Sequence, residues 1–431
     1  MSDYSKILAS PYAPTISIVA PAYNEEVTIV DNIRSLLSLH YNRLEIIIVN
    51  DGSKDNTLKL ALEAYRMVEV NHSFSSTLKT KKIRGIYKSN NPAFKKIIIV
   101  DKENGGKADA INAGINISSS QLFACIDVDC ILEPDALLKM AKPFMEESDK
   151  TVIATGGIVW LTNDAIIKDG RLIEMRMPKA FIVRMQVVEY IRAFLIGRTV
   201  WAKINGMMLI SGALGLFRKN VALAVGGYNH NTVGEDMDLV MRMHKYMLEN
   251  KLPYKVAYIP EPLCMTEAPS DYTILGRQRT RWARGTIECM LYHKIMMMNP
   301  KYGILGLLSY PYWLFAEWMA PIVEALGVIF FVVMSFLGLV DWQWAVSLLV
   351  FVYVFSVFIG FFSIYLQELV FYKYTQKRDL LVLMLHVLIE PFLYHPRVVW
   401  WSLKGNFQYF TGTAKGWGEM TRKGFNTSKK S

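Results

Sequence analysis

Three long apolar runs in the last third of the chain constrain its fold more than any other feature. Rich in Leu, Val, Ile and Phe, they cover residues 319–340, 344–366 and 380–401. The first two are long enough to cross a hydrocarbon core of ~30 Å as helices. The third contains Glu390-Pro391 and His395-Pro396, so we expect it to break, to re-enter the membrane or to line a cavity. The sequence therefore predicts two or three spans within residues 319–403.

The composition of the whole chain implies a mixed architecture. With 52% hydrophobic and 20% charged residues, it is too apolar for an ordinary soluble enzyme and too charged for a purely membrane-embedded protein. We expect a globular domain over residues 14–299, an interfacial helix over 300–318 and a basic tail over 404–431. The lead-in, residues 1–13, lacks the apolar core of a signal peptide. Membrane attachment is therefore expected from the C-terminal segments, unless another span precedes the lead-in.

The formal net charge of +10 favours partners that carry negative charge. Anionic lipid headgroups and phosphate ligands fit such a balance. Nucleic acid is not expected as a partner, because the sequence has no zinc-finger spacing, basic heptad region or RNA-binding aromatic signature. The cysteines at positions 125, 130, 264 and 289 form no CxxC pair, which favours a reducing cytosolic location over a disulfide scaffold.

The first half of the chain repeats a strand–loop–helix pattern. An apolar run followed by helical periodicity begins at TISIVAPAYNEE and recurs in LEIIIVNDGSKDNT, KIIIVDKENGGKADAINAGI and QLFACIDVDCILEPDALLKM. Continuous apolar strands that alternate with helices predict an α/β fold with a mostly parallel sheet, covered on both faces. Ligands of such sheets bind outside the carboxyl ends of the strands.

Polar residues follow these strands at the expected edge, namely Asp51, Asp101, Lys107, Asp127 and Asp129. Each alone is also an ordinary turn residue, so their convergence on one rim carries the argument. No GxGxxG follows the first strand, and ENGGKADA lacks the leading glycine and the Ser/Thr of a P-loop. We therefore expect a nucleotide held by carboxylates and a metal ion and not by a glycine-rich cradle.

The stretch CIDVDC contains the predicted metal site. Strand alternation points Asp127 and Asp129 to the same side. Two carboxylates can bind Mg²⁺ or Mn²⁺ and leave positions open for phosphate oxygens. Such a metal would neutralise charge that builds on a leaving diphosphate. An acidic strand end without a ligand is the structural alternative.

A second acidic cluster lies in GGYNHNTVGEDMDLVMRM, where Glu235, Asp236 and Asp238 begin a predicted helix. The helix dipole favours acids in a first turn, which is a purely structural explanation. A carboxylate near the metal rim can also take a proton from an acceptor hydroxyl in an inverting transfer. The residues alone leave both explanations open.

The stretch GRQRTRWARG combines arginines with one tryptophan. On a helix, Gln278, Arg281 and Trp282 share one face. A guanidinium group suits a diphosphate, and an indole suits the apolar face of a sugar ring. The remaining arginines are expected to meet lipid phosphates or protein acids: Arg277, Arg279 and Arg284.

These motifs occur together, in this order, in one known family. PAYNEE, NDGS, NGGKADAIN, Asp-x-Asp, GED and QRTRW, spread over residues 14–290, resemble the membrane-bound family 2 glycosyltransferases. Members are inverting enzymes and include synthases of cellulose, chitin, hyaluronan and poly-N-acetylglucosamine. The resemblance implies a GT-A domain, which is Rossmann-like and binds a nucleotide sugar, followed by interfacial and transmembrane α-helices.

The resemblance also implies roles on the donor side. Asp51 would hold the uracil end of a UDP-sugar, with Tyr23 and Glu25 nearby. Lys107 would lie along the donor. Asn50 stands where many members have a second aspartate, so Asp51 is the one carboxylate at this place in the motif.

By the same resemblance, Asp129 would be the principal metal ligand and Asp127 would support the diphosphate. Arg281 would clamp the diphosphate, and Asp236 would be the general base. The sequence has Gly-Glu-Asp in place of the commoner Thr-Glu-Asp, and the base position is retained.

The acceptor side is implied by the same family pattern. Trp282 would be the platform for the terminal sugar of the acceptor, and Gln278 would complete it. SGALGLFRKN, residues 211–220, resembles the acceptor-side loop of the family.

Charges beside the apolar runs give a partly conflicting topology. Lys373, Lys377 and Arg378 place the second loop inside, and the charge-poor VDWQW loop belongs outside, which agrees with a cytosolic catalytic domain. Three full spans would send the basic tail outside, so either the third segment does not cross or the rule fails here. The acids at positions 324, 368 and 390 either line a polysaccharide path or are satisfied by packing.

The sequence thus predicts a metal-dependent, inverting and processive β-glycosyltransferase in the cell (inner) membrane. Poly-N-acetylglucosamine synthases resemble the three-segment tail and KENGGKADAIN most, so UDP-N-acetylglucosamine is the favoured donor. The alternatives are a cellulose- or hyaluronan-like synthase, transfer of a single sugar to a lipid, and a non-catalytic nucleotide-sugar sensor. Expected partners are a polysaccharide or lipid-linked acceptor, the bilayer, and export or accessory subunits.

Overall fold

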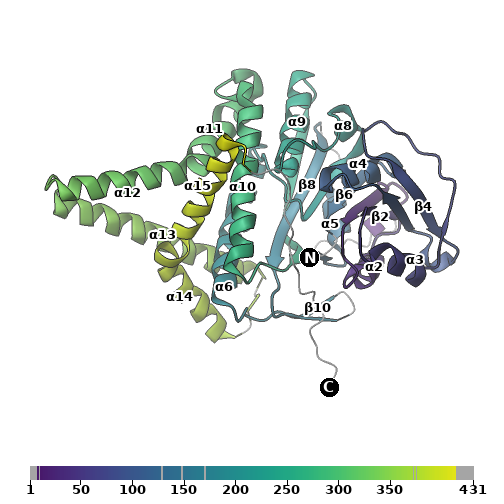
Figure 1. Cartoon of the computed structure of the whole chain (residues 1–431), viewed down its shortest axis with the longest axis horizontal. Coiled ribbons are helices and arrows are strands. Elements are labelled where there is room, and N and C mark those ends of the chain that lie inside the picture. Colours follow the sequence, from purple (N-terminus) through teal and green to yellow (C-terminus); the bar gives the residue numbers. More distant parts are fainter. Residues whose placement is uncertain are drawn as a thin grey trace.

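A ten-stranded sheet organises the first part of the chain and fills the right-hand side of Figure 1. The computed structural model describes residues 7–8, 10–127, 130–146, 149–168, 171–371, 373–374 and 376–413. In spatial order the strands are β3 (Met67–Glu69), β4 (Ile83–Ser89), β5 (Ile97–Lys102), β2 (Leu44–Asp51), β1 (Ile16–Ala22), β6 (Leu122–Ile126), β11 (Leu214–Arg218), β8 (Thr151–Leu161), β12 (Tyr254–Thr266) and β7 (Ile131–Leu132). A separate small sheet pairs β9 (Ile166–Lys168) with β10 (Arg171–Glu174).

The middle of the large sheet is parallel. β5, β2, β1 and β6 run in the same direction, with Ile18 opposite both Ile46 and Ala124. β11 is antiparallel to β6 and to β8, and β3, β4 and β7 are antiparallel to their neighbours as well. The prediction of a mostly parallel sheet is therefore wrong outside this block and the β8–β12 pair. Hydrophobicity alone does not separate the two cases, because buried strands of either direction are short apolar runs.

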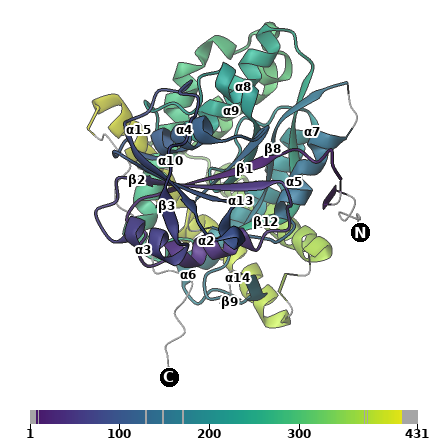
Figure 2. The same cartoon turned by 90° about the vertical axis from the view of Figure 1, so that its right-hand side faces the viewer.

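Successive residues of the central strands pack on opposite faces of the sheet. Ile16 and Ile18 of β1 join one core cluster, whereas Val19 joins the other. Two sets of helices cover these faces, namely α2 (Ile29–Leu37), α3 (Thr57–Ala64) and α5 (Ala136–Met145) on the first, and α4 (Lys107–Ile117), α8 (Lys219–Ala224) and α9 (Glu235–Glu249) on the second. Figure 2 shows α4, α8 and α9 above the strands and α2 and α3 below them. The predicted coverage of both faces is confirmed.

A helical layer connects the sheet to the apolar C-terminal part. It contains α6 (Phe181–Tyr190), the π-helical turn η2 (Ile191–Gly197), α7 (Arg198–Lys203) and α10 (Tyr272–Tyr292). α10 begins after Asp271, whose carboxylate accepts hydrogen bonds from the backbone N–H groups of Thr273 and Ile274 at 2.7 and 3.1 Å. This is an N-cap arrangement. The helix predicted for GRQRTRWARG is thus confirmed.

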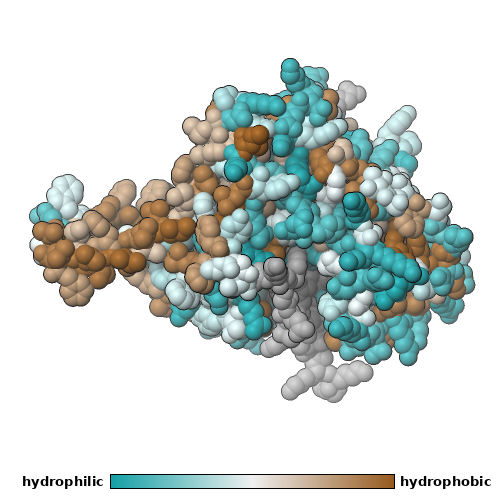
Figure 3. Space-filling model, turned by 45° about the horizontal axis from the view of Figure 1, so that its top comes forward, coloured by the Kyte–Doolittle hydropathy of each residue, from teal (hydrophilic) through white to brown (hydrophobic). Residues whose placement is uncertain are grey.

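An apolar hairpin of α12 (Ala320–Phe336) and α13 (Trp342–Phe371) projects from the body of the molecule and is the brown arm in Figure 3. Among the described helices, α13 alone is long and apolar enough to cross a membrane unaided. α12 has 17 residues, or ~26 Å, and ends near Gly338, which has φ +68°. That α12 crosses the membrane therefore stays a prediction. α12 qualifies only together with Leu305–Trp318, from which it is bent by 43°.

The segment predicted as an interfacial helix is helical over most of its length. The segment itself contains η4 (Pro300–Tyr302), η5 (Leu305–Ser309), α11 (Tyr310–Tyr312) and η6 (Trp313–Trp318). Its position at a membrane surface stays a prediction. Outside this segment, two further short turns are η1 (Pro92–Phe94), between β4 and β5, and η3 (Lys294–Met296), after α10.

The third apolar run is broken, as predicted, into α14 (Lys377–Leu393) and α15 (His395–Thr411), which meet at 48°. α15 does not follow the hairpin outward but lies along α10 (Figure 1). The two helices approach closely at glycines: a Cβ on Gly405 would lie 2.5 Å from the carbonyl oxygen of Thr280, and a Cβ on Gly276 would lie 2.7 Å from Nε1 of Trp401.

Candidate active site

Asp51, at the end of β2, lies beneath the loop that leads into α4. Its carboxylate is buried and accepts hydrogen bonds from the backbone N–H groups of Gly105 at 3.0 Å and Gly106 at 2.8 Å. The ammonium group of Lys102 donates a third, at 2.6 Å. Gly106 has φ +87°, a conformation that glycine adopts without strain. Protein groups therefore occupy both carboxylate oxygens, and direct contact between Asp51 and uracil stays a prediction.

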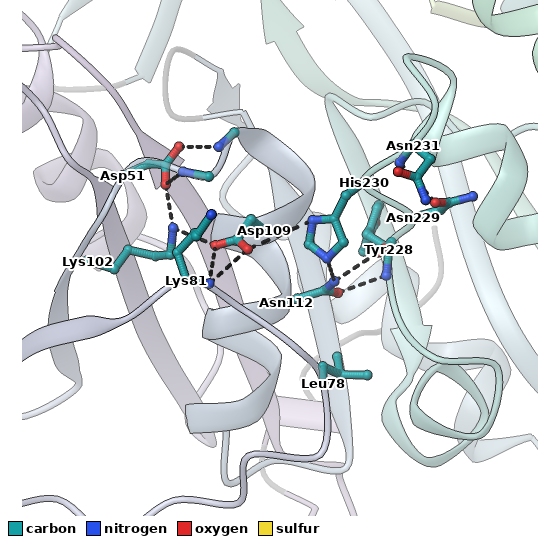
Figure 4. A network of polar contacts seen from close by, with 12 residues as sticks. Asp51, Leu78, Lys81, Lys102, Asp109, Asn112, Tyr228, Asn229, His230 and Asn231 are labelled. Carbon is teal, nitrogen blue, oxygen red and sulfur yellow. Dashed lines mark hydrogen bonds and ion pairs between the residues drawn. The ribbon is translucent and has the colours of Figure 1, made fainter. Parts of the chain in front are cut away.

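A buried polar network joins this loop to the segment before α9 (Figure 4). Lys102 is fully buried and bridges the carboxylates of Asp51 and Asp109 at 2.6 and 2.5 Å. Asn112 exchanges two hydrogen bonds of 2.8 Å with the backbone of Tyr228. These contacts therefore join the ends of β2 and β5 to α4, and α4 to the segment before α9.

Lys107, the first residue of α4, lies among acids from two other elements. Its Nζ is 2.5 Å from Oδ1 of Asp127, after β6, and 3.9 Å from Oε1 of Glu235, at the start of α9. Burial by itself lowers the pKa of Lys107, but these two carboxylates outweigh it and raise the pKa above its ordinary value. The ammonium group of Lys107 therefore places a positive charge between the end of β6 and the first residue of α9.

Asp236 faces the loop before β11. Its Oδ2 accepts a hydrogen bond from the backbone N–H of Gly212 at 3.1 Å. A Cβ on Gly212 would lie 3.2 Å from Nζ of Lys107 and 3.4 Å from Oδ2 of Asp236, so the backbone of this loop lies close to both side chains. The loop that resembles the family's acceptor-side loop thus lies directly beside the residue expected to be the base.

Glu235 is buried beside Asp236. Burial raises the pKa of Glu235 to about 7, Asp236 adds to the shift, and the positive charges of Lys107 and Arg281 oppose it. The guanidinium group of Arg281, on α10, is therefore within electrostatic range of Glu235. Positive groups and carboxylates that face one another in this way suit a phosphate group and a divalent cation.

Asp238, the third acid of the cluster, has a structural place. It accepts a hydrogen bond of 2.8 Å from Nε of Arg242 and lies 2.9 Å from Nε2 of His293, at the end of α10. Glu288 of α10 in turn accepts a bond of 2.9 Å from the backbone N–H of Val233. These contacts fix the start of α9 against α10, and they explain Asp238 without catalysis.

The predicted face of α10 is exposed to different degrees. The side chain of Trp282 is 40% exposed, and Gln278 and Arg281 are half-buried. Arg279 and Arg284 are buried and pair with protein acids at 2.6 and 3.2 Å. The expectation that the remaining arginines meet protein acids is therefore confirmed for these two.

Tyr23 and Glu25 follow β1, at the same end of the sheet. Tyr23 is 43% exposed. Glu25 accepts a hydrogen bond of 2.8 Å from the hydroxyl of Thr28, and its backbone N–H donates to Oγ1 of Thr57 at 2.7 Å. The place of both residues fits the donor side, and their contact with a nucleotide stays a prediction.

The predicted metal site is described only in part, because Asp129 lies outside the described residues. Asp127 keeps a partly exposed carboxylate beside Lys107. Within the described ranges, no three His, Cys, Asp or Glu side chains are grouped to hold a metal ion. A site made of Asp127 and Asp129 would therefore need further oxygen ligands from substrate, and such ligands suit Mg²⁺ or Mn²⁺.

Sequence reasoning missed two cations near the site. Arg198 lies over the ring of Phe194 at 3.7 Å and makes no hydrogen bond or ion pair with any described residue. Burial lowers the pKa of Arg198, and Tyr258 and Asp236 oppose the shift, so the guanidinium is within electrostatic range of Asp236. Its signal was an arginine within the apolar stretch EYIRAFLIGR. Lys102 could have been recognised because it ends an apolar strand, and a buried lysine needs a carboxylate partner.

Comparison with known families decides where the chain belongs. The model of glycosyl transferase family 2 matches residues 17–165, and that of glycosyl transferase family group 2 matches residues 122–365, more than half of the chain. The chain belongs to the family 2 glycosyltransferases. It is thus a glycosyltransferase, as the motifs predicted.

Curated relatives of this family 2 glycosyltransferase include poly-β-1,6-N-acetyl-D-glucosamine synthases. That of Staphylococcus epidermidis is 29% identical over 279 residues, which are 64% of this chain and 55% of the relative. That of Staphylococcus aureus strain COL is 29% identical over 318 residues, 72% of this chain and 64% of the relative. The chain therefore spans little more than half the length of the first. The predicted resemblance to this group is confirmed.

A solved structure shares the fold. The mannosyltransferase PcManGT from Pyrobaculum calidifontis, in complex with GDP-Man and Mn²⁺, superimposes with a TM-score of 0.56 at 13% identity. The match covers 95% of this chain and 93% of that one. At this identity the likeness shows the fold alone, and it confirms the predicted GT-A domain.

Proposed function

We propose that this glycosyltransferase transfers N-acetylglucosamine from UDP-N-acetylglucosamine to a growing β-linked polysaccharide at the cytosolic face of the membrane. The observation that carries the proposal is the meeting of Lys107, Asp127, Glu235 and Asp236 at the carboxyl ends of the parallel strands. The products named for the Staphylococcus relatives support the choice of sugar.

Asp236 is the general base in this proposal. The backbone N–H of Gly212 orients one of its oxygens at the loop where the acceptor hydroxyl would lie. By accepting the hydroxyl proton, Asp236 lets that oxygen attack the anomeric carbon from the face opposite the departing UDP. The new glycosidic bond forms as the bond to the diphosphate breaks, so the configuration inverts.

The leaving diphosphate gains negative charge during this step. Lys107 and Arg281 are the positive side chains placed to stabilise it. Asp127 and Asp129 would hold Mg²⁺ or Mn²⁺, which supplies further positive charge when bound, and the Mn²⁺ complex of the mannosyltransferase supports a divalent cation. Trp282, with Gln278 beside it, gives the acceptor sugar a stacking surface.

The proposal includes a membrane topology in which α12 and α13 cross as a hairpin. α12 and α13 run out and back, which returns the chain to the side of the catalytic domain. α15 then packs along α10 and does not continue outward. In this proposal the third apolar run does not cross the membrane, which would agree with the positive-inside rule.

The test uses the full chain in lipid nanodiscs with radiolabelled UDP-sugars and Mg²⁺ or Mn²⁺. We expect a long, β-linked product from UDP-N-acetylglucosamine alone, and none from Asp236→Asn, which should still bind the donor. Asp31→Asn, an exposed acid on α2, is the matched control. A product from a different UDP-sugar would overturn the donor, and a single-sugar lipid would overturn processivity. Donor binding without any transfer by the wild-type chain would favour a sensor.

A further inference from the structure

Two contacts join the α6–η2 segment to the junction of α14 and α15, defined here as residues 390–395. Nη2 of Arg192 is 2.9 Å from Oε1 of Glu390, and the hydroxyl of Tyr394 donates a hydrogen bond of 2.7 Å to Oε2 of Glu189. The side chains of Glu390 and Tyr394 are almost fully buried. Glu189 and Arg192 are one helical turn apart, and so are Glu390 and Tyr394. The two contacts therefore hold the junction at two points.

Glu189 also binds α10. Its two carboxylate oxygens accept hydrogen bonds from Nη1 and Nη2 of Arg279 at 2.6 and 2.8 Å. This is the bidentate fork in which arginine and carboxylate fit each other geometrically as well as electrostatically. One carboxylate thus accepts bonds from the α14–α15 junction and from α10 at the same time.

The guanidinium group of Arg279 lies over the ring of Trp282, 4.3 Å from its centroid. Such a contact between a cation and an aromatic face is attractive. Because Glu189 fixes the guanidinium, the contact limits the orientations open to the indole. Trp282 remains 40% exposed and therefore available to a ligand.

We infer that Glu189 and Tyr394 are positioning residues for the acceptor side of the reaction: through Arg279 they tie the indole of Trp282 to the α14–α15 junction. The inference deepens the proposed function and rests on it. It also offers a structural reason for the break in the third apolar run. Pro391 lies within the last turn of α14, where a straight helix would carry Tyr394 along the helix axis. The 48° bend instead coincides with the turn that Glu189 holds.

The inference predicts that a variant can weaken acceptor binding without changing donor binding at the same site. A sugar that stacks on Trp282 needs the indole in a fixed orientation, because stacking depends on the angle and offset of the two faces. In the proposed function Lys107 and Asp127 bind the donor. Lys107 pairs with Asp127 and Glu235, whereas Glu189 pairs with Arg279 and Tyr394. Loss of the Tyr394 hydroxyl therefore weakens acceptor binding and leaves donor binding as it was.

The experiment compares Tyr394→Phe with the wild-type chain in nanodiscs. It measures the KM for an N-acetylglucosamine oligosaccharide acceptor, product length, the Kd for UDP-N-acetylglucosamine, and hydrolysis of the donor by water. We expect the acceptor KM to rise at least fivefold and the product to shorten, while donor Kd and hydrolysis change less than twofold. Glu189→Gln should show a larger effect in the same direction. If Glu189→Gln does not fold, Tyr394→Phe still decides.

Tyr353→Phe is the matched control, because its hydroxyl joins α13 to α14 through the carbonyl oxygen of Leu388 at 3.1 Å and does not touch Glu189. This control should leave every measured value within twofold of wild type. An unchanged acceptor KM in Tyr394→Phe overturns the inference, and so does a parallel fall in elongation and hydrolysis, which would mean a merely structural role. A wild-type chain that elongates no acceptor refutes the proposed function instead.

Discussion

Gly234, immediately before the acids of α9, lies so close to Gly285 of α10 that a Cβ on Gly234 would be 2.8 Å from the Gly285 carbonyl oxygen. A Cβ on Gly285 would in turn be 2.9 Å from Cα of Gly234. The two helices therefore meet backbone to backbone, one turn away from Arg281. The pair explains why this chain has Gly-Glu-Asp where related enzymes more often have Thr-Glu-Asp: the threonine side chain would have no room.

Restoring the common family residue should damage the enzyme. Gly234→Thr forces α9 away from α10, and overpacking of this kind destabilises by about 1–3 kcal/mol. It also moves Glu235 away from Arg281 and shifts the neighbouring Asp236. We therefore expect the transfer rate to fall at least about tenfold, as it does when an electrostatic contact in an active site is lost. Thermal unfolding and initial rates measure the two effects. Gly327→Ala, whose Cβ would meet nothing within 4 Å, should change neither. A fully active Gly234→Thr would show that the helices separate without harm.

We expect Lys102 to contribute more to the free energy of unfolding than any single hydrogen bond in the loop that leads into α4. Lys102→Met leaves the buried carboxylates of Asp51 and Asp109 without their shared cation. Removal of one partner from a buried ion pair destabilises by about 3–5 kcal/mol. At roughly 2–4 °C per kcal/mol for a domain of this size, the unfolding temperature should fall by at least about 6 °C. The exposed Lys95→Met is the control, and equal melting temperatures in the two variants would contradict the prediction.

Arg198 should affect activity without supporting stability. Its guanidinium makes no hydrogen bond or ion pair with the described part of the chain, so Arg198→Gln breaks none. We expect an unchanged or higher unfolding temperature, because a partly buried charge without a bonded partner is unfavourable. If Arg198 binds substrate near Asp236, transfer should fall about tenfold or more, the loss expected for a hydrogen bond from a charged donor. Rates and melting curves decide, with the surface variant Arg34→Gln as reference. A variant that melts earlier and transfers normally would give Arg198 a structural role.

The strand-end residues were predictable because their position follows from the order of strands and helices. The meeting of Lys107 with Asp127 needed only the rule that parallel strands present their carboxyl ends at one edge. The approach of Glu235, on α9, does not follow from that rule. The place of Asp51 beneath the loop was not predictable. It depends on Lys102, and nothing in the spacing tells which of several nearby carboxylates a buried lysine selects.

The C-terminal contacts were harder still to predict. Arg192 and Glu390 are separated by 198 residues, and each lies in an apolar stretch that gives no sign of its partner. The sequence left Glu390 open between a polysaccharide path and a packed acid, and the structure pairs it with Arg192. Hydropathy likewise located α12 but not its end, because Leu337 and Leu339 are as apolar as the helix before them.

His244 predicts how the fold responds to acid. The imidazole is fully buried between the hydroxyl of Tyr254 and the carbonyl oxygen of Met207, at 2.8 and 2.9 Å. Burial lowers the pKa of His244 from 6.5 to about 4. Above pH 6.5 neither the folded nor the unfolded chain protonates this residue, so its full contribution to stability is present. Between pH 6.5 and pH 4 the unfolded chain takes up a proton that the folded chain refuses, and stability falls.

The size of this effect can be checked with one substitution. Lowering the pKa of His244 from 6.5 to about 4 corresponds to about 3 kcal/mol of folding free energy, nearly all of which is lost by pH 4. His244→Gln cannot titrate, so its unfolding temperature should fall less than that of the wild type between pH 7 and pH 5, although it melts lower at pH 7. If the unfolding temperatures of the wild type and His244→Gln fell by the same amount between pH 7 and pH 5, the folded chain would protonate this imidazole as readily as the unfolded chain does.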